Sequence, residues 1–151
     1  MPNSESGREH FMPAVIQLLA GALACLAFVL LARRAGSKRE ATIYAAALVV
    51  AALIYVGFAA VGGAALLWVA LEAGGLVLFS VVALLGLRIS VWALALGWIA
   101  HAGWDVLPHK VLSVGFVPEW YPFVCIGFDL FLAGYIAVSI RERRWPGAPR
   151  R

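Results

Sequence analysis

Four ionisable side chains lie in stretches of sequence that are otherwise almost entirely apolar: Glu72, His101, Asp105 and Asp129. A charge at the centre of a bilayer costs at least about 2.5–3.5 kcal/mol on insertion scales, so residues of this kind mark candidate functional sites. His101 and Asp105 are four positions apart, which places them on one face of a helix. We therefore predict one site to which all four residues contribute catalytic or metal-binding groups.

Several kinds of chemistry suit an imidazole among carboxylates. His101 and Asp105 can bind a divalent metal ion from one helix, with Glu72 and Asp129 approaching from neighbouring helices. Without a metal, the carboxylates can tune His101 into a general acid–base pair. The same groups can relay protons or bind an ion that crosses the membrane. Finally, they can form a satisfied polar network that only fixes helix packing. The sequence leaves these four alternatives open.

His109 extends the pattern, because it follows Asp105 by the same spacing at which Asp105 follows His101. On a continuous helix the three side chains stay near one face. Pro108 precedes His109, however, and proline lacks an N–H and clashes with the preceding helical turn. His109 is predicted as a further metal ligand whose participation depends on where the helix ends.

The composition indicates a polytopic membrane protein. The 151 residues are 64% hydrophobic, against about 45–50% in soluble domains, and only 13% are charged. The mean hydropathy is +0.92. The net charge of +4 does not indicate a nucleic-acid partner, because the basic residues gather at the ends of apolar spans, where they act as topology signals. Cys25 and Cys125 lack metal-site or redox-motif spacing and are interpreted as small packing residues.

The apolar stretches predict an all-α bundle, because a helix of about 20 apolar residues crosses a bilayer. Gly62-Gly63 is the predicted turn between two of the helices, Pro108 ends or kinks another, and Pro122 suits the first turn of the last. A polar segment at 1–13 precedes the bundle; it lacks the features of a cleaved secretory signal. A basic cytoplasmic tail follows at 141–151. Five spans are predicted, at residues 14–32, 41–60, 64–87, 89–107 and 123–140.

The basic residues predict that the N-terminus lies outside and the C-terminus inside, because cytoplasmic loops are enriched in Lys and Arg. Only Arg8 and Lys110 then lie outside. In this orientation all four ionisable residues fall in the outer half of the membrane, where they can meet. The basic residues predicted to lie inside are Arg33, Arg34, Lys38, Arg39, Arg88, Arg141, Arg143, Arg144, Arg150 and Arg151.

The run from Gly97 to Asp105, with the sequence GWIAHAGWD, resembles a bacterial family of small integral-membrane proteins, the domain of unknown function 6010. The resemblance covers roughly residues 55–136 and leaves the first span outside it. It implies a membrane location and a similar set of polar residues, without an established activity. The family pattern has two adjacent histidines after the Trp-Asp pair; here Pro108 occupies the first position and His109 the second. Supporting positions are Tyr55, Gly62, Gly63, Glu72, Pro118, Cys125 and Asp129.

Together these features predict a multi-pass protein of the bacterial plasma membrane, with a polar pocket that opens toward the outer face beneath the loop at 108–122. We expect a membrane-embedded enzyme or binding protein for a lipid-like small molecule, with membrane lipids as partners. The alternatives are a small ion or proton transporter, including an ion-conducting homo-oligomer, and a non-catalytic structural subunit. The inner halves of the predicted spans hold no ionisable residue, which favours a site closed toward the cytoplasm over a continuous path.

Overall fold

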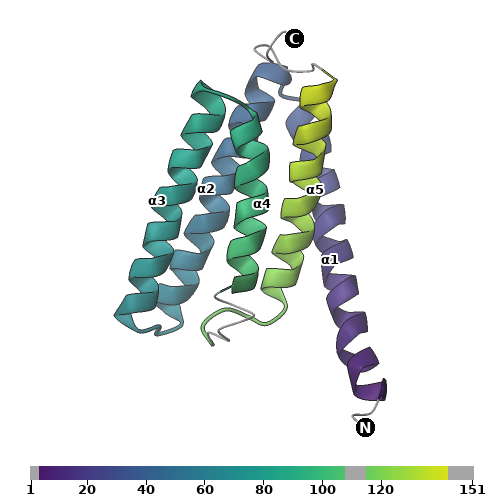
Figure 1. Ribbon diagram of the computed structural model, residues 1–151, viewed down its shortest axis with the longest axis vertical. Coiled ribbons are helices and arrows are strands. Elements are labelled where there is room, and N and C mark those ends of the chain that lie inside the picture. The colour runs from purple at the N-terminus through teal and green to yellow at the C-terminus, as the bar shows by residue number, and fades with distance from the viewer. Residues whose placement is uncertain (1–3, 108–114, 143–151) are drawn as a thin grey trace.

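The computed structural model describes residues 4–107 and 115–142, and within these ranges the chain is helical with short turns. Each helix runs opposite to the one before it (Figure 1). The all-α prediction is confirmed for this part of the chain. The helices are α1 (Ser4–Arg33), α2 (Ser37–Val61), α3 (Leu66–Arg88), α4 (Trp92–Val106) and α5 (Tyr121–Arg141).

Four helices are long and apolar enough to cross a membrane, namely α1 from Pro13, α2 from Arg39, α3 and α5. The predicted span at 89–107 is not among them, because α4 has only 15 residues. At 1.5 Å per residue it is about 22 Å long, shorter than the hydrocarbon core of about 30 Å. The helix is short because α3 continues to Arg88 and a turn occupies the following residues before Trp92.

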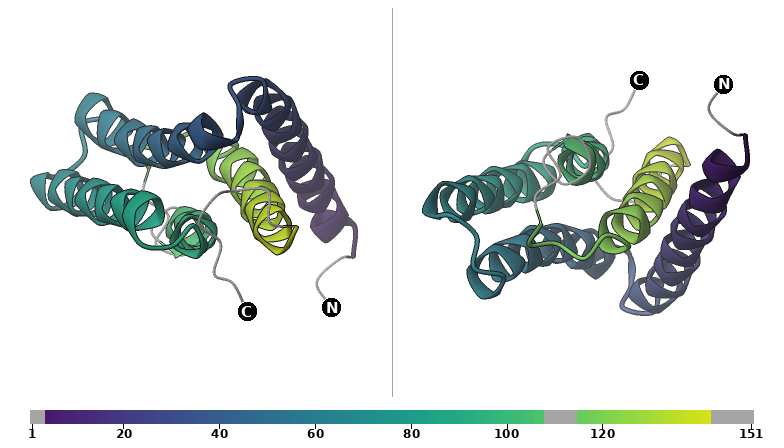
Figure 2. Two further views of the ribbon diagram at one scale, coloured as in Figure 1. Left: turned by 90° about the horizontal axis from the view of Figure 1, so that it is seen from above. Right: turned by 90° about the horizontal axis from the view of Figure 1, so that it is seen from below.

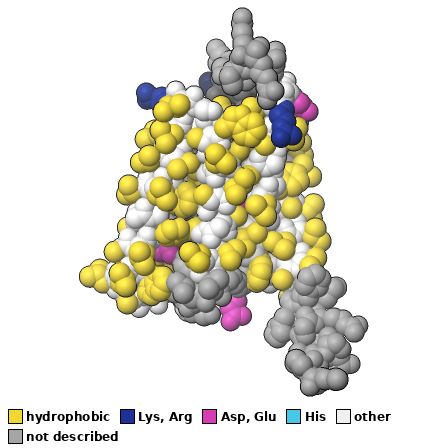
Figure 3. Space-filling view, in the orientation of Figure 1, with side chains coloured by type: hydrophobic (Ala, Val, Ile, Leu, Met, Phe, Trp, Pro, Cys, Tyr) yellow, Lys and Arg dark blue, Asp and Glu magenta, His cyan; other side chains and the backbone are white. Residues whose placement is uncertain are grey.

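The outward faces of the helices are apolar, as expected of a bundle surrounded by lipid. Leu23 on α1 is 66% exposed, and Val77 on α3 is 64% exposed. Figure 3 shows hydrophobic side chains over the whole length of the visible face, with lysine and arginine side chains at one end. An apolar surface this extensive marks contact with a membrane rather than with water.

The predicted turn at Gly62-Gly63 and the predicted place of Pro122 are confirmed, whereas Pro108 lies outside the described residues. α2 ends at Val61, Gly62 follows as its C-cap, and Gly63 takes a φ of 68°, which glycine adopts without strain. Pro122 lies in the first turn of α5, as expected. The segment at 1–13 is not a separate polar element throughout, because α1 already begins at Ser4 and contains Pro13.

α4 lies against three other helices and leaves one face exposed, where Leu96 is 62% and Ile99 51% exposed. It packs between α3 and α5 and also touches α2, while α1 packs chiefly against α5 (Figure 2). Gly97 allows α4 to lie close to its neighbours, since a Cβ there would meet Val82 and Leu48 at 2.7 and 2.9 Å. The buried residues of α4 are Leu94, Ala95, Gly97, Trp98, His101, Ala102 and Asp105.

A buried glutamate joins α2 to α5 near the end of the bundle where α2 begins. Glu40 is 6% exposed, and its Oε1 accepts hydrogen bonds from the Tyr44 hydroxyl at 2.9 Å and the Tyr135 hydroxyl at 2.7 Å. We did not single out these residues from the sequence, where Glu40 closes a basic loop. Glu40 and Tyr44 are four positions apart on one helix, and this spacing could have indicated their contact.

Two glycines let the backbones of α1 and α5 touch. A methyl group on Gly21 would overlap the carbonyl oxygen of Val124, and one on Gly127 would overlap the carbonyl oxygen of Leu18. Small residues at a crossing allow this close approach, which is a main source of helix association in membranes. The two helices are therefore locked together by backbone contact rather than by large side chains.

This contact predicts that Gly127→Ala destabilises the protein, because α1 and α5 must separate to admit the new methyl group. Gly134→Ala on the same helix is the matched control, since a Cβ at Gly134 meets nothing within 4 Å. We expect the midpoint of thermal unfolding in detergent to fall for Gly127→Ala and to stay level or rise slightly for the control. Equal midpoints for the two variants would contradict the proposed close packing.

Candidate functional site

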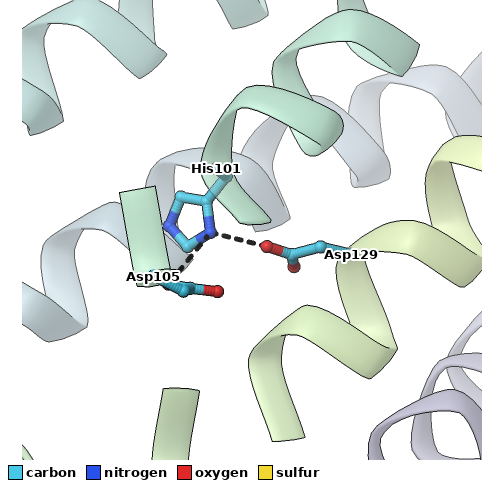
Figure 4. Close-up of side chains that lie close together, drawn as sticks. All are labelled: His101, Asp105 and Asp129. Carbon is cyan, nitrogen blue, oxygen red and sulfur yellow. Dashed lines mark hydrogen bonds and ion pairs between the residues drawn. The ribbon is translucent and has the colours of Figure 1, made fainter. Parts of the chain in front are cut away.

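Three of the four predicted residues come together where α4 faces α5 (Figure 4). His101 Nδ1 lies 2.8 Å from Asp129 Oδ2 and 3.7 Å from Asp105 Oδ1. His101 and Asp105 share one face of α4, as their spacing predicts, and Asp129 approaches from α5. One ligand atom from each residue lies within 4.8 Å of the others.

The cluster is shielded from the surroundings. His101 and Asp105 are fully buried, and Asp129 is 2% exposed. Three aromatic rings surround the imidazole: the centroid of Phe79 lies 4.9 Å away, that of Tyr55 5.9 Å and that of Trp98 6.2 Å. In such a low-dielectric environment the hydrogen bond between imidazole and carboxylate is stronger than in water.

The two nitrogens of His101 have different roles. Both carboxylate contacts are made by Nδ1, whereas Nε2 points away from Asp129 (Figure 4). Nε2 is buried and has no hydrogen-bond partner among the described residues. An ionised carboxylate only accepts hydrogen bonds, so Nδ1 then carries the proton and a neutral imidazole keeps its lone pair on Nε2. This arrangement is the one expected of a general base or of a metal ligand oriented by carboxylate.

Glu72 lies on α3 and takes a different partner. Its side chain is 2% exposed, and its Oε2 accepts a hydrogen bond of 3.0 Å from Trp104 Nε1. Gly75 makes this possible, because the indole of Trp104 lies 3.1 Å from where a Cβ would stand. Glu72 is thus near the cluster but not among its three grouped residues. His109, the remaining predicted ligand, lies outside the described residues.

Residues that we did not predict as members of the site complete the surroundings of the cluster. The ring of Tyr55 lies 5.9 Å from the imidazole of His101, and Cys125 lines a cavity together with Asp129. Tyr121 packs its ring 5.7 Å from that of Tyr55. Cys125 was interpreted as a packing residue, although its position one helical turn before Asp129 was a usable signal.

A cavity of about 290 Å³ lies between α2, α4 and α5 and reaches this cluster through Asp129. Val50 and Ile54 in its wall are 53% and 39% exposed, so it opens sideways between α2 and α5. This cavity is almost entirely apolar and lateral. The polar pocket expected beneath the loop at 108–122 depends in part on residues 108–114, which lie outside the described residues. The described lining residues are Ala47, Val50, Ala51, Ile54, Trp98, Tyr121, Val124, Cys125, Phe128 and Asp129.

The three grouped residues also suit a metal ion. An ion shared by all three residues would be bound by Nδ1, the nitrogen that faces both carboxylates, and Nδ1 would then carry no proton. One imidazole nitrogen and two carboxylates form a donor set that zinc and related divalent ions accept, with a further position free for another ligand. The separation of the ligand atoms, within 4.8 Å, is compatible with a shared ion after small side-chain rotations. The geometry therefore allows either a metal or a shared proton.

Comparison with known proteins identifies the family. Residues 14–142 match the family described as Family of unknown function (DUF6010). The chain belongs to this family. The match confirms the resemblance seen in the sequence but extends it, because α1 lies inside the matched region rather than outside it. All three grouped residues lie within the match. No curated protein and no solved structure matches the chain.

The His101–Asp129 contact predicts a strong coupling between these residues in stability. Replacing either by leucine leaves a buried polar group unpaired, which costs about 1–3 kcal/mol. The double variant His101→Leu/Asp129→Leu removes both groups, so we expect it to be less destabilised than the sum of the single variants. Thermal unfolding in detergent of the wild type, the two single variants and the double variant measures this coupling. The pair His101→Leu and Glu72→Leu is the control and should show a smaller coupling; equal couplings would refute the assigned contact.

Proposed function

We propose that this protein binds a lipid-like, amphipathic molecule in the lateral cavity and performs acid–base chemistry on it or holds it there. The observation that supports this most is the cavity itself. Asp129 is the one carboxylate among its described lining residues, in walls that are otherwise nearly all apolar. A molecule with an apolar chain and a polar head fits such walls, and the lateral opening lets it enter directly from the membrane.

Trp98 supports a polar head at the same place. Its ring lines the cavity, its side chain is 1% exposed, and its indole N–H has no hydrogen-bond partner in the described part of the chain. A buried indole N–H usually finds an acceptor. An acceptor atom on the head of a bound molecule would satisfy it, while Asp129 contacts the same head.

The cluster behind Asp129 supplies the chemistry. In this proposal Asp129 contacts the ligand and accepts a proton from its head group, while His101 Nδ1–H donates to the same carboxylate across the 2.8 Å contact and holds it in position. Asp105 Oδ1, 3.7 Å from the same nitrogen, helps to keep the imidazole in this orientation. Because water is excluded, these charges act on a bound head group more strongly than they would in solution.

We also propose that α4 completes a five-span topology, with the N-terminus outside and the C-terminus in the cytoplasm of a bacterial cell. α3 ends and α5 begins at opposite ends of the bundle, so α4 returns the chain from one end to the other (Figure 1). Arg33, Arg88 and Arg141 lie in the last turns of α1, α3 and α5, which finish at one end. The enrichment of basic residues in cytoplasmic loops assigns that end to the inside.

Filling the cavity tests the binding function. Ala51→Leu places a larger side chain in the wall, whereas Ala46→Leu changes an exposed residue of the same helix and is the control. Native mass spectrometry of protein extracted in mild detergent measures bound lipid-like molecules. We expect about one such molecule per chain in the wild type and in Ala46→Leu, consistent with one cavity of this size, and loss of it in Ala51→Leu. Unchanged occupancy in Ala51→Leu would rule the cavity out.

A second candidate function is divalent metal binding, which the grouping of three ligand atoms within 4.8 Å favours. Elemental analysis of protein purified without chelators tests it. This function predicts a metal in the wild type and in Glu72→Gln, whose carboxylate lies outside the group, and its loss in His101→Ala and Asp105→Asn. Metal-free wild-type protein would contradict the metal function and leave the acid–base pair.

A further inference from the structure

We propose that the molecule bound in the cavity is an amphiphilic organic cation, an alkyl amine or alkyl quaternary ammonium compound. This inference rests on the proposed function, because it assigns a charge to the head group of the same ligand. Three features of the cavity carry it: the charge of the cluster at its wall, the aromatic rings beside Asp129, and the division of its walls between polar and apolar sides.

The cluster is neutral or negative whenever a carboxylate in it is ionised. It contains two carboxyl groups, Asp105 and Asp129, and one imidazole, His101. The described lining residues of the cavity include no lysine or arginine. An anionic head group would therefore face a carboxylate with no compensating charge, which is costly where water is excluded. A cationic head group meets an opposite charge instead.

Aromatic rings line the same cavity as the carboxylate of Asp129. Trp98, Tyr121 and Phe128 all line the cavity, and the ring centroids of Trp98 and Phe128 are 5.7 Å apart. The faces of such rings attract ammonium groups, most strongly where the cation is desolvated. A carboxylate among several aromatic rings is a typical environment for a bound alkylammonium group.

The helices that line the cavity also differ in the polarity of the side chains that they contribute. α5 presents Tyr121, Cys125 and Asp129 at successive helical turns, so they share one face of that helix. α2 presents only alanine, valine and isoleucine. The head group therefore lies against α4 and α5, and the alkyl chain lies along α2 toward the lateral opening.

Two probes with the same tail test the charge assignment: dodecyltrimethylammonium and the neutral tetraethylene glycol monododecyl ether. Isothermal titration calorimetry on the full-length protein in maltoside micelles gives both affinities. We expect the cation to bind about tenfold more tightly than the neutral probe, as expected for one added favourable charge contact. Asp129→Asn should remove this preference. Glu119→Gln, which neutralises an exposed carboxylate outside the cavity, is the control and should retain it.

Phe128→Leu keeps the charge of the cluster and so remains informative if Asp129→Asn fails to fold. It should weaken binding of the cation more than binding of the neutral probe, because only the cation gains from the ring face. Equal affinities of the two probes in the wild type, or a preference that survives both Asp129→Asn and Phe128→Leu, would overturn the charge assignment alone. Failure of both probes to bind, or binding unaffected by Ala51→Leu, would overturn the proposed function itself.

Discussion

A 2.8 Å contact between His101 Nδ1 on α4 and Asp129 Oδ2 on α5 lies at the centre of a bundle whose outer surface is apolar. Ionisable groups in such an interior must find partners within the protein, because neither lipid nor bulk water supplies them. This requirement orients α4 and α5 about their axes so that the two side chains face each other. It also explains why α4 directs His101 and Asp105 inward and leaves apolar side chains such as Leu96 and Ile99 exposed.

The placement of α5 depends on a second kind of contact. Gly21 and Gly127 bring the backbones of α1 and α5 together, so that α5 is held from behind while Asp129 faces α4. Dispersion contacts between closely approaching backbones stabilise helix pairs in a membrane. The hydrophobic effect does not drive helices together there, because lipid tails are as apolar as the helix surfaces. A rigid support of this kind keeps a functional carboxylate in a constant position.

α2 and α5 are linked by a hydrogen bond near the start of α2 and are separated by a cavity further along. The Tyr135 hydroxyl donates to Glu40 and links the two helices near the start of α2. Further along, a cavity of about 290 Å³ separates them and reaches Asp129. Polar contact at one end and an apolar opening at the other give the bundle a sideways entrance, which is suited to a ligand that arrives from the membrane.

The sequence by itself determined the helical class, the turn at Gly62-Gly63, the start of α5 near Pro122 and the pairing of His101 with Asp105 on one face. These features follow from local hydropathy, local backbone preferences and helical periodicity. Only the tertiary structure decided that Asp129 joins the pair, that Glu72 binds Trp104, and that the cavity is lateral and apolar. Those outcomes depend on how each helix is rotated and how closely it packs, and these are set by contacts between residues far apart in the chain.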